Sequence, residues 1–101
     1  MPPSAHQLQR HIRTCALDTA CVFLTKHAQE RMQERGATLA MVYEVLQSGV
    51  LTGIPEASIA STGVACKMHR CVCGENWVAC VAVEYPEPDL VVVTVYELEG
   101  A

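Results

Sequence analysis

The first fifth of the chain shows a helical pattern of apolar residues. Ser4 is a residue type that caps helices, and after it the apolar side chains recur every three or four positions, at Ala5, Leu8, Ile12 and Cys15. This spacing places them in one stripe and predicts a first helix within residues 1–22. The apolar run Cys21–Leu24 is too short for a helix, so it predicts a strand or an extended lead-in.

Two further helices are marked by the residues at their ends. Thr25 is a typical N-cap and Gly36 suits the position after a helix, so the sequence predicts a helix over Lys26–Arg35. Thr38 begins a third helix that stops at Gly49. Its apolar face comprises Leu39, Val42, Val45 and Leu46. The turn between these helices is short, so they form a helical hairpin or a bent pair.

After Gly49 the pattern changes to that of strands. We expect Val50–Ile54 to be a strand that ends at Pro55, followed by a loop or a weak hairpin end over Glu56–Gly63. Three longer strands are separated by short turns, at Val64–Cys73, Trp77–Tyr85 and Leu90–Leu98. Because short turns join antiparallel neighbours, the predicted fold is α+β. Two or three helices are expected to pack on a three- or four-stranded antiparallel sheet.

Composition limits the class of protein. The chain has 101 residues, of which 50% are hydrophobic and 18% charged, as is typical of a single globular domain over residues 1–101. No apolar stretch approaches the ~20 residues that span a bilayer, and no secretory signal is evident. We therefore expect no membrane association, a cytoplasmic location, and reduced cysteines that mostly pack as small core residues.

Charge narrows the classes of partner. Eleven acidic and seven basic residues give a formal net charge of −4. Phosphate binding needs positive charge, which in an acidic chain must come from a local cluster. The dense cluster here comprises Lys26, His27, Arg31 and Arg35. Since the last three are four residues apart, they share one helix face. The hypothesis is an anion clamp with a histidine beside it, and the alternative is a solvated charged face.

A metal site is not expected. His69 lies near Cys66, Cys71 and Cys73, but alternate residues of a strand are about 7 Å apart and cannot converge on one zinc ion without a bulge. Cys80 on the next strand is the fourth cysteine of this region. Packing is the favoured role of all four cysteines. The chain has no phosphate-binding glycine loop and no nucleophile motif. We predict neither a metal nor a cofactor.

Three segments carry a resemblance to a known family. They are the pattern H-A-x-x-R-M-x-x-R-G over residues 27–36, the L-x-x-G that ends the next helix, and the last strand V-V-V-T-V-Y at residues 91–96. Together they resemble the bacterial domain-of-unknown-function family number four-two-five-eight. The resemblance covers about residues 23–96, within a family-like core of residues 23–98. Residues 1–22 are an additional N-terminal helix outside it.

The resemblance implies a RelE-like α+β fold. Relatives of this family include the RelE-type and BrnT-type toxins of toxin–antitoxin systems, which are mostly metal-independent ribonucleases. The motif positions in this chain are His27, Arg31, Arg35, Gly36, Thr94 and Tyr96.

Metal-independent RNA cleavage defines roles for these residues. A base must take the proton of the ribose 2′-hydroxyl, a cation must stabilise the charge on phosphorus, and an acid must protonate the leaving oxygen. The catalytic candidates are His27, Arg31, Arg35 and Tyr96. The substrate-binding candidates are Lys26, Lys67 and Arg70. On one strand Lys67 and His69 point to one face and Arg70 to the other, so at most one of these groups faces the helix.

Two functions of different class are therefore open. The first is a toxin-like endoribonuclease or RNA-phosphate-binding domain, with RNA as its partner. The second is a non-catalytic protein-binding module of the same fold, a regulator or inhibitor whose partner is an antitoxin or another protein; the acidic balance favours it. A homodimer is expected if Leu90–Leu98 lies at the sheet edge and pairs across two copies.

Overall fold

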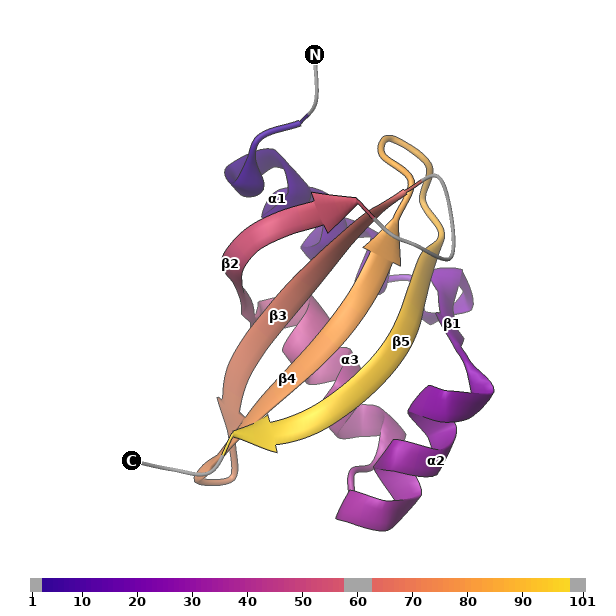
Figure 1. Ribbon diagram of the computed structural model, residues 1–101, viewed down its shortest axis with the longest axis vertical. Coiled ribbons are helices and arrows are strands. Elements are labelled where there is room, and N and C mark those ends of the chain that lie inside the picture. The colour runs from indigo at the N-terminus through magenta and orange to yellow at the C-terminus, as the bar shows by residue number, and fades with distance from the viewer. Residues whose placement is uncertain (1–2, 58–62, 99–101) are drawn as a thin grey trace.

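The computed structural model describes residues 3–57 and 63–98 and shows an α+β fold (Figure 1). The helices are α1 (Ala5–Ala16), α2 (Lys26–Arg35) and α3 (Leu39–Ser48), with a short 3-10 turn η1 at Thr19–Cys21. The strands are β1 (Val22–Leu24), β2 (Val50–Ala57), β3 (Val64–Val72), β4 (Glu75–Val83) and β5 (Leu90–Leu98). They form one sheet in the order β1-β5-β4-β3-β2. No helix in the described part of the chain is long and apolar enough to cross a membrane.

The expectation of three or four antiparallel strands was wrong, because the sheet has five strands and is mixed. Strands β2 to β5 form the expected antiparallel meander, but β1 pairs with β5 in parallel, with Val22 opposite Leu90 and Leu24 opposite Val92. A three-residue strand carries too little pattern to be distinguished from a lead-in to a helix. Its addition places the first three residues of β5, Leu90–Val92, inside the sheet. The dimer expected through β5 would therefore have to pair along Val93–Leu98, and it stays a prediction.

Several strand ends also differ from the expected ones, since β3 ends at Val72 rather than Cys73 and β4 at Val83 rather than Tyr85. Strand β2 does not stop at Pro55 but bulges away from β3 after Thr52 and pairs again at Glu56. The expected loop over residues 56–63 thus begins later, and its residues 58–62 lie outside the described residues. Strand β4 begins at Glu75, because Cys73 and Gly74 form a tight turn with φ of 52° and 83°. Two-residue turns with positive φ join the twisted strands of a hairpin.

All three helices begin at the predicted caps. The hydroxyls of Ser4, Thr25 and Thr38 each accept the N–H three residues on, at 3.1, 3.1 and 3.2 Å. Helix α2 has the predicted bounds and ends at Gly36, whose φ of 71° is the left-handed conformation that closes a helix. Thr25 also fixes α2 to the sheet. Its N–H donates to the Val92 carbonyl at 3.1 Å and its hydroxyl to the Val93 carbonyl at 3.0 Å.

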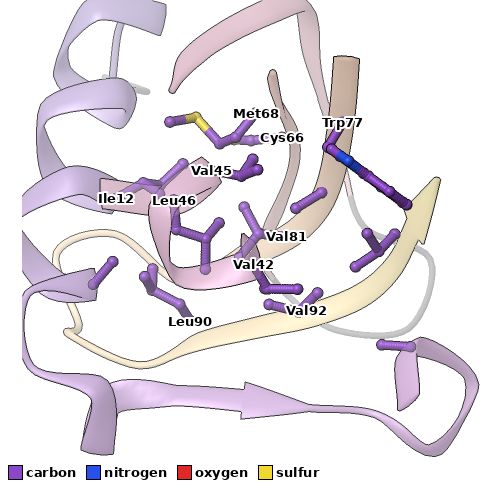
Figure 2. Close-up of a cluster of buried hydrophobic side chains, with 14 of the residues drawn as sticks. Ile12, Val42, Val45, Leu46, Cys66, Met68, Trp77, Val81, Leu90 and Val92 are labelled. Atoms are coloured by element: carbon purple, nitrogen blue, oxygen red, sulfur yellow. The ribbon is translucent and has the colours of Figure 1, made fainter. Parts of the chain in front are cut away.

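The helices gather behind one face of the sheet, and the core lies between these two layers (Figures 1 and 2). Helix α1 contributes Leu8 and Ile12, and α3 contributes Val42 and Leu46. The sheet contributes its inward-facing residues, which include Met68, Trp77, Ala79, Val81, Leu90 and Val92. Burial of this apolar surface drives the packing of both layers.

Helix α1 belongs to the same core, and polar bonds hold it in place. The Arg13 guanidinium donates to the Gly49 carbonyl at 2.8 Å, and Gln47 donates to the Ala16 carbonyl at 2.9 Å. The Gln9 amide oxygen accepts the N–H of Leu51 at 2.9 Å. This last bond satisfies an outward-facing donor of β2, which is an edge strand.

Most of the cysteines do not pack in the core, contrary to expectation. Only Cys66 is buried; Cys71 and Cys73 are exposed, and Cys15, Cys21 and Cys80 are intermediate. None of the six is in a disulfide. Burial raises the pKa of the Cys66 thiol from its ordinary 9.0 to about 11. The neutral thiol is therefore the form that suits the folded protein.

The Cys66 thiol makes stability dependent on pH in the alkaline range. Its folded-state pKa is raised, so its contribution is complete below pH 9 and is lost as the pH rises towards 11. We expect the unfolding free energy at pH 10.5, relative to pH 8, to fall by about 2 kcal/mol more in the natural protein than in Cys66→Ala. Urea unfolding at both pH values measures this difference. An equal fall in both proteins would contradict it.

Gly49 stands where no side chain fits. A Cβ there would collide with the Val45 carbonyl oxygen and lie 2.8 Å from the His69 carbonyl oxygen, both of them backbone atoms. We expect Gly49→Ala to lower the unfolding free energy by about 2–3 kcal/mol. The matched control is Gly53→Ala, whose Cβ meets nothing within 4 Å but whose φ of 69° is unfavourable. That control should cost about 1 kcal/mol, and equal losses in the two variants would refute the steric argument.

Candidate functional site

The face of the sheet turned away from the helices (Figure 1) is the open face. The strand register arranges its residues in cross-strand rows. The first row is Glu56, Ala65, Ala82, Val91 and Phe23. The second is Thr52, Lys67, Cys80 and Thr94. The third is Val50, His69, Val78 and Tyr96, and the fourth is Cys71, Asn76 and Leu98. Chemically active groups thus concentrate in the second and third rows.

His69 is the histidine in these rows, and a neighbouring side chain orients it. Its Nε2 lies 3.0 Å from the Asn76 side-chain oxygen, and the imidazole is half-buried. Because an amide oxygen only accepts, Nε2 carries the proton and donates it, and in the neutral ring Nδ1 is left as an acceptor. A histidine held by a neighbouring acceptor in this way has the orientation that a general base needs.

Lys67 and Tyr96 lie on the same face as His69. Lys67 is two residues before His69 on β3, and Tyr96 is in the same row as His69, on the far side of Val78. Since neighbouring strands are about 4.8 Å apart, the backbones that carry His69 and Tyr96 are separated by roughly 10 Å. An ammonium group, an imidazole and a phenol therefore surround one small area of the sheet.

A groove adjoins Lys67 where β2 bulges away from β3. It has a volume of about 420 Å³ and is lined by Thr52, Gly53, Ile54, Glu56, Ala65, Cys66, Lys67 and Cys80. Burial raises the pKa of the Cys80 thiol, and the charge of Lys67 opposes that shift. The thiol is therefore kept protonated, and it does not have the low pKa of a reactive cysteine.

Helix α2 lies beside β5, the strand that carries Tyr96 (Figure 1). The cation row of α2 comprises Lys26, His27, Arg31 and Arg35. His27 and Arg31 each precede a buried residue of α2, Ala28 and Met32, so both project about 100° to the same side of the packed stripe. Lys26 and His27 are exposed. Arg31 pairs with Glu34 at 3.0 Å, an exposed ion pair of the kind that contributes little to stability. Arg31 can therefore exchange this partner for an anionic ligand.

Arg35 is exposed, but it lies near an acidic side chain, Glu97. The pKa of the Glu97 carboxyl is raised chiefly by a hydrogen bond with Glu75, and Arg35 opposes the shift through its charge. The last turn of α2 thus has a local counter-charge. Arg35 is the member of the cation row least suited to hold a phosphate.

Arg70 is separated from the other candidates by the sheet. As expected from strand alternation, it points to the face opposite Lys67, where its Nη1 donates to the Ser48 carbonyl at 3.3 Å. Its Nε lies 3.5 Å from the Glu44 carboxylate. Arg70 therefore completes the carboxyl end of α3, where a cation is favourable. The structure brings Lys67 and Tyr96 to one face and places Arg70 on the other.

The pairing of His69 with Asn76 is not predicted by the sequence pattern. The alternation along β3 places His69 beside Lys67, but the bond to Asn76 depends on the register set by the Cys73-Gly74 turn. In the described ranges, 3–57 and 63–98, no group of three or more His, Cys, Asp or Glu side chains is placed to hold a metal ion.

The open face also carries exposed apolar side chains. Phe23 is 50% exposed, Val50 45% and Leu98 44%, and they stand at three different margins of the face. They stand singly rather than as one contiguous patch, as exposed apolar residues ordinarily do on a protein surface.

Comparison with known proteins gives one family. The model of the family described as "Domain of unknown function (DUF4258)" matches residues 24–97, from the end of β1 to the end of β5. The comparisons with curated proteins and with solved structures found no match. The match covers most of the chain. It includes α2 and the open-face residues Lys67, His69 and Tyr96, and it leaves α1 outside. The chain is therefore a member of the DUF4258 family.

Proposed function

We propose that this protein binds single-stranded RNA on the open face and, around the β5 side of the sheet, on α2, and cleaves it without a metal ion. The observation that carries the proposal is the His69–Asn76 pair, which shares one face with Lys67 and Tyr96. An oriented base, a cation and a proton donor are the three groups that this reaction requires. The proposal includes a RelE-like mode of action, in keeping with the resemblance of the α2 and β5 motifs.

His69 takes the role of general base in this mechanism. Its Nδ1 accepts the proton of the ribose 2′-hydroxyl, and the 2′-oxygen attacks phosphorus. The bond from phosphorus to the 5′-oxygen breaks, and Tyr96 donates its hydroxyl proton to that oxygen. The products are a 2′,3′-cyclic phosphate and a 5′-hydroxyl end. Lys67 stabilises the negative charge that develops on the phosphoryl oxygens.

The α2 cations bind the flanking phosphates. Arg31 can grip phosphate oxygens with two parallel hydrogen bonds, and Lys26 and His27 extend the positive surface along the helix. His27 was the expected acid or base. It has no hydrogen bond within the described residues that would orient it, so binding suits it better than proton transfer.

The test is cleavage of a labelled single-stranded RNA by the purified protein in the presence of a chelator. We expect the RNA to be cut and the DNA of the same sequence to stay intact, because DNA lacks the 2′-hydroxyl. His69→Gln should lower the rate at least about 100-fold, the usual contribution of a general base. Arg31→Gln should instead weaken binding of the uncut DNA analogue and make it less dependent on salt.

His6→Gln is the control, since His6 is exposed on α1, on the far side of the sheet from the open face. It should cleave like the natural protein. Circular dichroism checks that each variant is folded. The nuclease proposal fails if the natural protein leaves RNA intact, or if His69→Gln cuts as fast as the His6 control.

A second candidate is a protein-binding module, which the cation Lys67 at the centre of the open face favours. Lys67 and His69 are central in this face, whereas its acid, Glu56, stands at the β2 corner. The partner that fits is an acidic amphipathic segment, whose apolar side chains cover Val50 and Leu98 and whose carboxylates meet Lys67.

Selection from a library of displayed peptides tests this second candidate. We expect enriched peptides to alternate apolar residues with Asp or Glu, and to bind Lys67→Glu at least about tenfold more weakly than the natural protein. Lys26→Glu, on α2, is the matched charge control and should retain binding. Peptides that bind Lys67→Glu as tightly as the control would exclude this use of the open face.

A further inference from the structure

A groove distinct from the open face lies between α1 and the turn that joins β4 to β5. It has a volume of about 340 Å³ and is lined by Gln7, Arg10, His11, Thr14 and Tyr85. Four of these residues form the outward stripe of α1, opposite the stripe that carries Leu8 and Ile12 into the core. Four of the five lining residues thus come from a helix outside the family match.

The groove is held in shape by contacts between its two walls. The His11 Nε2 lies 2.7 Å from the Glu87 carbonyl oxygen, to which it donates. The His11 ring also meets the Tyr85 ring edge to face, with centroids 5.0 Å apart and planes at 65°. Such aromatic pairs stabilise the geometry that they adopt. The turn is therefore fixed against α1, and the groove needs no rearrangement to receive a ligand.

The polar groups of the groove favour an anion. Its lining contains a guanidinium, an imidazole, an amide, a hydroxyl and a phenol, but no carboxylate. Within residues 3–57 and 63–98, Arg10 makes no ion pair or hydrogen bond. Arg13, one turn further on, donates to the carbonyls of Gly49 and Ser48. One arginine of α1 thus serves the fold, and the other presents free donors to the groove.

We propose that this groove binds a mononucleotide, with its phosphate on Arg10 and its base against the ring of Tyr85. The Tyr85 residue is 43% exposed, so part of its ring is available for stacking. The volume lies near the lower end of the range for small-ligand pockets, about 300–1,000 Å³, which suits one nucleotide and excludes a polymer. Gln7 and Thr14 supply further donors on either side of Arg10.

This site is independent of the proposed nuclease. Its residues lie on the helix side of the sheet and at the end of β4, whereas Lys67, His69 and Tyr96 lie on the open face. The failure of one proposal leaves the other standing.

Binding can be followed by NMR shifts of the backbone amides during titration with adenosine monophosphate. Shifts should centre on Gln7, Arg10, Thr14 and Tyr85. Arg10→Gln should weaken binding by about 10- to 100-fold, the effect of losing a charge-assisted hydrogen bond. Tyr85→Leu should weaken adenosine monophosphate about tenfold or more and leave the binding of inorganic phosphate unchanged. His6→Gln, an exposed site on the same helix outside the groove, is the control and should bind normally.

Three results would overturn the proposal. The first is an absence of shifts around the groove at millimolar ligand. The second is equal binding by Arg10→Gln and the His6 control, or shifts confined to α2. The third is inorganic phosphate binding as tightly as the nucleotide, which would leave Tyr85 without a role. Both groove substitutions are at exposed positions, and the dispersion of the spectrum shows whether each variant is folded.

Discussion

One-sided covering of the sheet is the constraint on which the rest of the structure depends. The three helices have 12, 10 and 10 residues, and all of them pack on the same face of the five strands. That face supplies the core residues, among them Met68, Trp77 and Val81. The opposite face is left to solvent, and strand alternation places Lys67, His69 and Tyr96 there. The arrangement that stabilises the fold thus also presents the candidate chemistry.

Local signals predicted the helices well because each helix has its own capping residues. Thr25 and Gly36 give α2 its bounds, and Thr38 gives α3 its start, through contacts within a few residues. The strand β5 also has its predicted bounds. Long-range features were harder. The parallel pairing of β1 rests on Val22 meeting Leu90 across the whole chain, and nothing near Val22 encodes the identity of that partner.

The candidate site shows the same division between local and distant information. The spacing of His27 and Arg31 could be read as one helix face, and Lys67 could be separated from Arg70 by alternation alone. The role of Arg70 could not be predicted from the sequence, because its partners Glu44 and Ser48 lie more than twenty residues earlier, on α3. The pairing of His69 with Asn76 likewise needs the hairpin register. A net charge of −4 conceals this arrangement, since it averages over cations that are locally grouped.

Helix α1 makes the folded unit larger than the family segment. Leu8, Ile12 and Ala16 are essentially inaccessible, and Arg13 bonds to the backbone where α3 meets β2. A chain beginning at residue 24 would therefore expose an apolar channel over α3 and leave the N–H of Leu51 at a bare sheet edge. Family members without such a helix must close that channel with other residues or with another chain. The limits of the shared segment are thus a poor guide to where such a protein can be cut.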